Sequence, residues 1–462
     1  MHMTPEEFRE NGYAVIDWLA GYMERVEELR VLPGVAPGDI AAMLPDRAPE
    51  GSDGFAAILS DLDEVVMPGI THWQSPNWFA YFPANVSGPS ILAELAASGL
   101  GQQGMLWSTS PAATEIETRV LDWLVDLMGL PQGWKSAGPG GGVIQMSASD
   151  STHAALVVAR HQRREDASAE RMVVYASSQA HSSIEKGCTV AGIGHCSKVD
   201  VDESFALDPV ALEAAIADDV ARGLLPVAVV SAVGTTGTTA VDPIGAIADI
   251  AEAHRLWHHV DAAYAGTAMI CDEFRVYQPA LARVDSYTFN PHKWMMVNFD
   301  CNVLWVANRK PLIDTMSILP PYLRNAASAG GDVVDYRDWH VPLGRRFRSL
   351  KLWWVLRYYG AVGLRAMVRD HVALANRFAT WVEMDDRFEL FAPHPFGLVC
   401  FTHVGGNEAT RQLADDLNET GDVAVTPSQI GDTWFIRVSI GQTCTDGRHV
   451  EALWELIDEL AS

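Results

Sequence analysis

Residues 225–261 constrain the fold most, because they alternate a strand, a helix and a second strand. The run 225–233 is rich in β-branched residues and ends at the glycine of a turn, and residues 257–261 form a second strand-like run. Between them, apolar residues recur at helical spacing after Asp242, which is predicted to cap this helix. A strand–helix–strand unit implies parallel strands joined by a right-handed crossover. The sequence therefore predicts an α/β fold with a mostly parallel sheet.

The carboxyl ends of these strands carry polar residues, and open α/β sheets bind their ligands at that edge. Asp261 ends one predicted strand, and Thr236 follows another. The short strand 286–289 leads into residues 290–294, with the sequence NPHKW, which bring Lys293 to the same edge. This placement predicts a ligand site there.

Lys293 has the chemistry to hold an aldehyde. Its amine can form a Schiff base, and a carboxylate such as Asp261 can keep a pyridine nitrogen protonated. A lysine is ordinarily a solvated surface charge. Lys293, however, follows a turn proline and precedes an apolar run, where a free ammonium would be costly. The two residues together predict a site for pyridoxal phosphate.

Two further features fit such a site. Residues 140–149 form a glycine-rich turn before a helix, where backbone N–H groups and hydroxyls could bind a phosphate. Taken alone, a glycine cluster is more often a flexible loop, and this one lacks the spacing of a nucleotide-binding loop. His181 follows the strand-like residues 172–175. A histidine there is usually structural, but in a cofactor pocket its ring could lie over the pyridine face and relay a proton.

Two other segments leave alternatives open. Tyr322 precedes the small polar run 325–331, as expected of a lid hinged on glycines that brings a proton donor to the site. An ordinary loop tyrosine is the alternative. The aromatic run 73–83 could form the wall of a pocket for a flat side chain, and core packing explains it equally well.

Composition excludes some partners and leaves others open. The 462 residues include 33 basic and 59 acidic side chains, and the net charge of −26 argues against nucleic acids and anionic membranes as partners. The six cysteines show neither a CxxC pair nor metal-ligand spacing, so no metal and a reducing, cytoplasmic setting are expected. The sequence shows neither a signal-peptide pattern nor an apolar run of about 20 residues.

Three segments are expected along the chain. Thr4 and Pro5 predict the start of an N-terminal helix, which has little to bury against and is expected to pack on a second subunit. Residues 32–54 look like a connector. The alternating strands and helices follow, and from residue 350 a helix leads into a smaller C-terminal region.

Together these motifs resemble the group II pyridoxal phosphate decarboxylases, most closely the aromatic L-amino-acid decarboxylases. The resemblance runs over nearly the whole chain and is most specific in residues 71–73, 80–83, 110–115, 140–149, 259–266, 290–301 and 344–351. It implies the α/β fold of the type I pyridoxal phosphate-dependent transferases, which is like that of aspartate aminotransferase. It also implies a homodimer with the active site at the subunit interface. Each subunit would comprise a helical arm (1–80), a large cofactor-binding domain (81–355) and a small α+β domain (356–462).

The resemblance also assigns roles residue by residue. Lys293 would form the Schiff base, and Asp261 would pair with the pyridine nitrogen. His181 and Ala263 would lie on opposite faces of the ring. The cofactor phosphate would be bound by Ala148, Ser149, Asn290 and His292, with Thr236 near the cofactor and the substrate carboxylate. The residues matching substrate-pocket positions are Trp73, Tyr81, Phe82, Pro83, Gln103, Met105 and Gly344. Of these, Gln103 and Met105 would reach across the dimer interface, where family members more often carry apolar or aromatic residues.

The implied reaction is decarboxylation of aromatic L-amino acids to the corresponding amines and CO2. Tyr322 would be involved in protonating the product carbon, with help from His181. Related aromatic aldehyde synthases, which also deaminate oxidatively, typically replace one of these two residues, so their presence favours simple decarboxylation. A non-catalytic relative that only binds the cofactor is a further alternative. Gly344 leaves room for an indole ring and favours tryptophan among the aromatic substrates.

Overall fold

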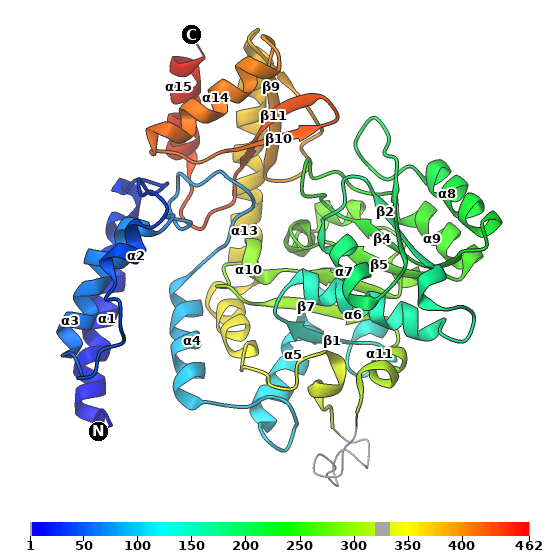
Figure 1. Cartoon of the computed structure of the whole chain (residues 1–462), viewed down its shortest axis with the longest axis horizontal. Coiled ribbons are helices and arrows are strands. Elements are labelled where there is room, and N and C mark those ends of the chain that lie inside the picture. Colours follow the sequence, from blue (N-terminus) through cyan, green and yellow to red (C-terminus); the bar gives the residue numbers. More distant parts are fainter. Residues whose placement is uncertain (1, 319–332, 462) are drawn as a thin grey trace. The chain divides into compact units, whose positions relative to one another are not determined.

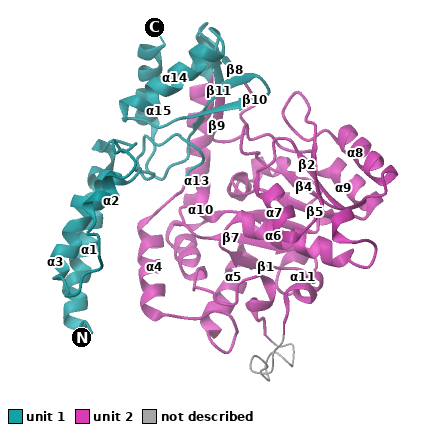
Figure 2. Ribbon diagram, in the orientation of Figure 1, with its two compact units in different colours: residues 1–83, 380–389, 401–462 teal, residues 84–379, 390–400 magenta. Residues whose placement is uncertain are grey.

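The computed structural model describes residues 2–318 and 333–461 (Figure 1). Tyr322 and the predicted lid therefore lie outside the described residues. The chain divides into two compact units, coloured separately in Figure 2. One comprises residues 1–83, 380–389 and 401–462, and the other comprises residues 84–379 and 390–400. The three-segment division given by the resemblance stays a prediction.

The second unit is built on a seven-stranded sheet. Its strands are β1 (Gly141–Gln145), β2 (Met172–Ser177), β3 (His195–Val199), β4 (Leu225–Ala232), β5 (Trp257–Asp261), β6 (Ser286–Phe289) and β7 (Asn302–Val306). They are ordered β1-β7-β6-β5-β4-β2-β3. The five strands from β6 to β3 are parallel, whereas β7 runs antiparallel to both β6 and β1. The predicted α/β fold with a mostly parallel sheet is confirmed.

Helices cover both faces of this sheet (Figure 1). Alternate residues of β2 and β4 point to opposite faces, as the pleat of a strand requires. Val174 and Val230 pack in one core with α6 (Ala148–Gln162) and α7 (Ser183–Ala191). Val173 and Val229 pack in the other core with α8 (Pro209–Ala221) and α9 (Ile244–His254). Burial on both faces explains why these strands read as continuous apolar runs.

The remaining helices of this unit connect the strands or flank them. They are α4 (Gly88–Leu100), α5 (Pro111–Leu127), α10 (Pro291–Trp294), α11 (Arg309–Met316) and most of α13 (Ser349–Met384). Of these, α5 contacts β1, and α10 contacts β7.

Strand direction places the carboxyl ends of six strands at one edge of the sheet. Because β7 is antiparallel to both of its neighbours, β1 runs in the same direction as β6. The carboxyl ends of β1, β6, β5, β4, β2 and β3 therefore lie at the same edge, where a ligand site is expected. Two backbone hydrogen bonds fix neighbouring ends, from Val233 N to Asp261 O at 2.9 Å and from Ala262 N to Thr288 O at 2.9 Å.

The glycine-rich stretch was wrongly predicted as a turn, since Gly141 and Gly142 lie in strand β1. A Cβ atom at Gly141 would lie 2.6 Å from the indole of Trp339, and one at Gly142 would lie 2.7 Å from Trp305 Nε1. Both distances are shorter than a van der Waals contact. The glycines are thus required by indole rings packed against the strand rather than by a flexible loop.

The predicted cap of α9 was also wrong. The helix begins after Pro243, and no side chain caps it. The Asp242 carboxylate instead accepts hydrogen bonds from the backbone N–H groups of Leu207 and Ala232, each at 2.7 Å. Burial raises the pKa of Asp242 to about 7. Asp242 therefore ties two loops together inside the core.

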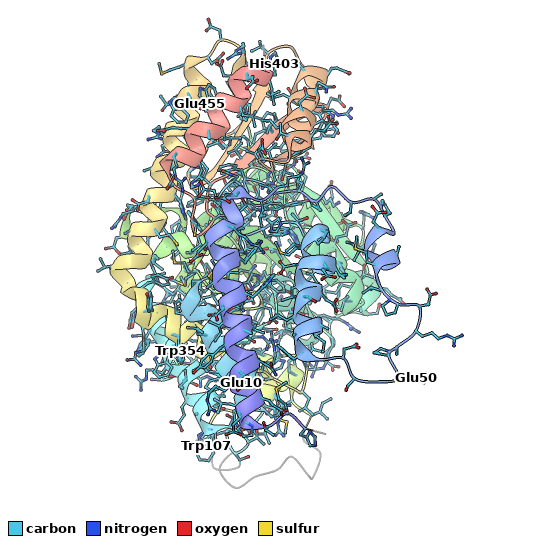
Figure 3. All side chains as sticks on the ribbon, turned by 90° about the vertical axis from the view of Figure 1, so that its left-hand side faces the viewer. Glu10, Glu50, Trp107, Trp354, His403 and Glu455 are labelled. Atoms are coloured by element: carbon cyan, nitrogen blue, oxygen red, sulfur yellow. The ribbon has the colours of Figure 1, made fainter. Side chains whose placement is uncertain are left out.

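The first unit contains the N-terminal helices α1 (Pro5–Arg25), α2 (Asp39–Met43) and α3 (Phe55–Asp61) and the C-terminal helices α14 (Asn407–Thr420) and α15 (Gly447–Leu460). The predicted cap of α1 is confirmed, since Thr4 and Glu7 form reciprocal hydrogen bonds of 2.7 and 3.2 Å. No residue of α1 is buried. Figure 3 shows this helix with Glu10 labelled.

A second sheet has the strand order β10-β11-β9-β8. Its strands are β8 (Phe388–Leu390), β9 (Leu398–His403), β10 (Thr426–Ile430) and β11 (Thr433–Ser439). β10 and β11 form an antiparallel hairpin within the first unit. Among the described residues, no helix is both long enough and apolar enough to cross a membrane.

Candidate active site

The lysine lies on a tightly held turn after β6. Asn290 precedes the one-turn helix α10, and Pro291 occupies its first position, where the missing N–H costs nothing. The backbone N–H of Lys293 donates to Asn290 O at 3.0 Å, and its carbonyl accepts from Asn85 N at 3.2 Å. Trp294 is fully buried, whereas Lys293 is partly exposed. The backbone of the turn is therefore anchored on both sides of the lysine.

The turn after β5 is fixed to the lysine turn. Asn290 N donates to Ala263 O at 3.0 Å, and Ala263 N donates to Asp261 Oδ1 at 2.9 Å. The rings of Tyr264 and Trp294 stack with centroids 4.9 Å apart and planes inclined by 14°. These contacts hold the Asp261 carboxylate and the Lys293 backbone in one rigid frame.

His181 comes to the same site from the loop between β2 and α7. Its Nδ1 accepts a hydrogen bond from Ser183 N at 3.1 Å, so the neutral ring carries its proton on Nε2. Although the residue is exposed in the single chain, desolvation by the atoms around the ring lowers the pKa of His181. The charge of Asp261 opposes this change, and that of Lys293 adds to it. The structure thus brings together three of the four residues predicted to do the chemistry, and the fourth, Tyr322, lies outside the described residues.

His292 is a buried, neutral hydrogen-bond donor. Its pKa is lowered to about 3, mainly by burial and also by the positive charges of Lys293 and Lys351, whereas the contact with Cys301 raises it slightly. Its Nδ1 accepts from Cys301 N at 2.9 Å, which leaves the proton on Nε2. In the described part of the chain, that N–H has no hydrogen-bond partner.

Asn290 lies beside the amino end of α6. Its Oδ1 accepts from Asn302 Nδ2 at 2.7 Å, and Asn302 also donates to Thr288 and is held by Ser151 of α6. The Nδ2 group of Asn290 has no partner among the described residues. Asn302 therefore ties the end of β6 to α6 and orients the Asn290 amide.

The amino end of α6 offers further donors. Ser147 caps the helix by accepting from Asp150 N at 3.2 Å. The N–H groups of Ala148 and Ser149 are the first two of the helix, and such groups have no partner within a helix. The helix dipole adds a partial positive charge at this end. The arrangement suits an anion.

Thr236 lies in the turn after β4, and its side chain is exposed. The turn is sharp because Gly234 has a φ of +85°, and a Cβ atom there would lie 2.8 Å from the Cβ of Ala265. No hydrogen bond of the Thr236 side chain is formed with the described residues. Thr236 thus lies at the ligand edge of the sheet, as its position after a strand predicted.

Three predicted pocket residues, Gln103, Met105 and Gly344, lie in the second unit. Gln103 Oε1 accepts from Arg345 N at 2.6 Å, and a Cβ atom at Gly344 would lie 3.4 Å from Gln103 Nε2. Met105 O accepts from Arg337 N at 3.0 Å. The side chain of Gln103 therefore borders the space that Gly344 leaves open.

The other four predicted pocket residues lie in the first unit. Trp73 and Tyr81 are exposed and stack with centroids 5.6 Å apart, whereas Phe82 and Pro83 are buried. Tyr81 has a φ of +53°, an uncommon conformation for a tyrosine. It is supported by a 2.7 Å hydrogen bond from Tyr81 N to Thr426. The aromatic run thus contributes both to a core and to an exposed surface.

Sequence reasoning missed Asn302 as a residue that organises the site. Asn302 opens β7, and its three side-chain donations all reach β6 or the residue after it. An asparagine at the start of an otherwise apolar strand was the only available signal. Its partners are adjacent only because β7 pairs antiparallel with β6.

Comparisons with known proteins identify the family. Residues 37–404 match the pyridoxal-dependent decarboxylase conserved domain. The chain belongs to this family. It is 42% identical to a phenylacetaldehyde synthase of Arabidopsis thaliana, covering 100% of this chain and 97% of the relative. It is 41% identical to an aromatic-L-amino-acid decarboxylase of Bos taurus, with coverage of 100% and 97%. The crystal structure of Oryza sativa TDC with PLP and tryptamine matches with a TM-score of 0.98 and 38% identity, covering 100% and 99%.

Membership in the pyridoxal-dependent decarboxylase family confirms the predicted resemblance and the predicted fold class. It makes the protein a decarboxylase, a type of lyase, with pyridoxal 5′-phosphate as its cofactor. The residues present fit this group. They supply an amine at Lys293, a carboxylate at Asp261, and donors without a partner among the described residues at Asn290, at His292 and at the amino end of α6.

The neutral state of His292 predicts a pH-dependent stability. Its folded pKa of about 3 lies below the value of about 6.5 expected in the unfolded chain, so only the unfolded chain takes up this proton between those values. The free energy of unfolding of the apoenzyme should therefore fall as the pH drops below about 6.5. The contribution of this histidine should be about 2 kcal/mol by pH 5.

The variant His292→Asn keeps an acceptor but removes the titration. Urea unfolding of the apoenzyme at pH 6.5 and pH 5 should show a smaller loss of stability in this variant than in the parent. His2→Asn, which changes an exposed side chain, is the matched control. Identical pH dependences for parent and His292→Asn would contradict the assignment.

Proposed function

We propose that this protein is a homodimeric decarboxylase of aromatic L-amino acids, which releases CO2 and the corresponding amine. The observation that carries the proposal is the meeting of Lys293, Asp261 and His181 at one sheet edge. Relatives named as acting on aromatic amino acids, alike over the full length of the chain, support the substrate class.

The chain's own residues divide the work. Lys293 would supply the amine that holds the cofactor aldehyde, and Asp261 would keep the pyridine nitrogen protonated. His181 and Ala263 would confine the ring from its two faces. When bound, the cofactor supplies an electron sink for the pair left on the substrate Cα as CO2 departs. Tyr322, outside the described residues, and His181 are proposed to deliver the proton to that carbon.

The phosphate is proposed to lie at the amino end of α6. Ala148 and Ser149 would contribute backbone N–H groups, and Asn290 and His292 would contribute side-chain donors. Because His292 is neutral, the compensating positive charge comes from the helix dipole rather than from this imidazole. Thr236 would face the substrate carboxylate from the turn after β4.

Tryptophan is the substrate favoured by the space at Gly344. In the described structure, a Cβ atom added there would meet only the Gln103 amide within 4 Å. A glycine at this position therefore leaves width for an indole ring, and Gln103 gives one wall a polar edge. Met105 of the same unit is proposed to line this pocket, and Trp73, Tyr81, Phe82 and Pro83 of the first unit stay predicted substrate-pocket residues.

Aldehyde synthesis is the second candidate, because a phenylacetaldehyde synthase is among the relatives. Both reactions begin with loss of CO2, so only their products separate them. The presence of Tyr322 and His181 supports simple decarboxylation over this alternative.

The proposed activity predicts one amine for each CO2 released. The purified protein should be offered tryptophan, tyrosine, dopa and phenylalanine in competition, with CO2, amines, ammonia and peroxide all measured. Amine should equal CO2, and tryptamine should dominate. Lys293→Ala should abolish turnover, whereas Lys310→Ala, which alters an exposed lysine of α11, should not. Ammonia and peroxide matching CO2 would instead establish the aldehyde synthase, and cofactor binding without any product would leave only a binding protein.

Exposed apolar side chains on the helices α1 and α4 support the proposed homodimer. In α1, Phe8, Tyr13, Ile16 and Met23 are between 40% and 62% exposed. In the other unit, Leu92, Leu95 and Leu100 of α4 are between 48% and 59% exposed. Apolar side chains grouped on helices are a mark of interfaces. A second copy of the chain is the partner proposed for these faces.

The dimer predicts a particle of twice the 50.4 kDa chain mass in sedimentation at micromolar concentration. Replacing both Phe8 and Ile16 by Asp should shift the population toward the monomer, because charges would enter the apolar contact. Val210→Asp changes a more exposed valine of α8 and should leave the mass unchanged. A parent protein that sediments as a monomer would refute the dimer.

A further inference from the structure

An ion pair takes the place of a neighbouring strand beside β1. β1 lies at the end of the sheet order, and β7 is its only strand partner among residues 2–318 and 333–461. On its outer side, Ile144 N donates to Glu117 Oε1 at 2.8 Å, and Ile144 O accepts from Arg345 Nη2 at 2.9 Å. In an antiparallel pair, one residue exchanges both of these bonds with a neighbouring strand. Here two side chains from distant parts of the chain make them instead.

The two side chains also bond to each other. Arg345 Nη2 and Glu117 Oε1 are 2.6 Å apart, and only 4% and 3% of the two side chains is exposed. Buried charges persist only when they are paired and hydrogen-bonded, and here both conditions are met through one backbone residue. Glu117, Arg345 and Ile144 therefore form a closed triangle of hydrogen bonds.

Arg345 is held in place by further contacts. Its guanidinium lies over the ring of Tyr336, 4.7 Å from the centroid, and its backbone N–H donates to Gln103 Oε1 at 2.6 Å. Its carbonyl accepts from Gly104 N at 2.9 Å. These contacts hold Arg345 in one position, so the guanidinium that bonds Ile144 is not a mobile surface charge.

The position of Ile144 matters because α6 begins four residues later. Ser147, the cap of α6, follows Ile144 by three residues, and Ala148 and Ser149 come next. A shift of the Ile144 backbone is passed along this short segment to the N–H groups proposed to bind phosphate. We propose that Glu117 and Arg345 are positioning residues for the cofactor phosphate. By fixing the end of β1, they orient the N–H groups of α6 that would bind it. The inference rests on the proposed placement of that phosphate at α6.

A purely structural role is the competing explanation, since breaking a buried ion pair destabilises a protein. The two explanations predict different effects on ligand affinity. A positioning role affects binding through the phosphate alone, whereas general destabilisation affects every ligand of the site. Pyridoxal carries the same aldehyde and ring as the cofactor but has no phosphate, so it separates the two.

The test measures the affinity of the apoenzyme for pyridoxal 5′-phosphate and for pyridoxal by absorbance titration. Glu117→Gln keeps an oxygen for Ile144 N but removes the charge that holds Arg345. Its dissociation constant for pyridoxal 5′-phosphate should rise about ten-fold, as is typical when an outer partner of a ligand is lost. The constant for pyridoxal should be unchanged. Equal losses for both ligands, or no loss for either, would overturn the proposal.

A double variant keeps the test decisive if Glu117→Gln folds poorly. Glu117→Leu with Arg345→Met replaces the pair by apolar side chains of similar size, which should restore thermal stability without restoring the bonds to Ile144. Its affinity for pyridoxal 5′-phosphate should stay low, and exchange of the Ile144 amide hydrogen should be faster. Recovery of cofactor affinity together with stability would show that the pair is merely structural. Tyr175→Phe, which removes a buried 3.0 Å hydrogen bond to Asp219, is the matched control and should bind both ligands normally.

One further variant separates this inference from the placement on which it rests. Ser149→Ala should weaken binding of pyridoxal 5′-phosphate but not of pyridoxal if the phosphate lies at α6. If Ser149→Ala has that effect and the Glu117 variants do not, the inference fails while the placement stands. If Ser149→Ala has no effect, the placement itself fails.

Discussion

Backbone hydrogen bonds between adjacent strand ends are the constraint on which the site depends. Ala262 N donates to Thr288 O at 2.9 Å, and Asn290 N donates to Ala263 O at 3.0 Å. These bonds continue the pairing of β5 and β6 beyond the sheet, so the turns bearing Asp261 and Lys293 cannot move independently. Preorganisation of this kind matters for catalysis, because the carboxylate and the amine that we propose to hold the cofactor would need a fixed separation. The parallel sheet thus determines the distance between the two groups.

Burial determines the charges around that frame. The imidazole of His292 is kept neutral because its charged form would be poorly solvated and close to two lysines. The same environment disfavours a proton on His181, although Asp261 opposes it. The site therefore offers neutral donors where a phosphate is proposed and reserves positive charge for Lys293 and the helix dipole. Farther from the lysine, Glu117 and Arg345 form a buried ion pair. Their side chains also bond the backbone N–H and carbonyl of Ile144 on the outer side of β1.

Local patterns predicted the features that depend on neighbours in the sequence. The strand–helix–strand unit and the lysine after a short strand both follow from periodicity and turn residues. Features that depend on tertiary packing were missed. The glycines of β1 resemble a loop because the indoles that exclude side chains there come from Trp305 and Trp339. The role of Asp242 was misjudged because its partner Leu207 lies in a different loop. No local signal could pair Glu117 with a residue 228 positions away.

The amine of Lys293 is proposed to carry the cofactor. Borohydride reduction of the yellow holoenzyme, followed by proteolysis and mass spectrometry of the labelled peptide, measures this directly. The account predicts a single pyridoxyl label on Lys293, within the peptide that contains NPHKW. A label on any other lysine, or recovery of all the cofactor unattached after reduction, would contradict it.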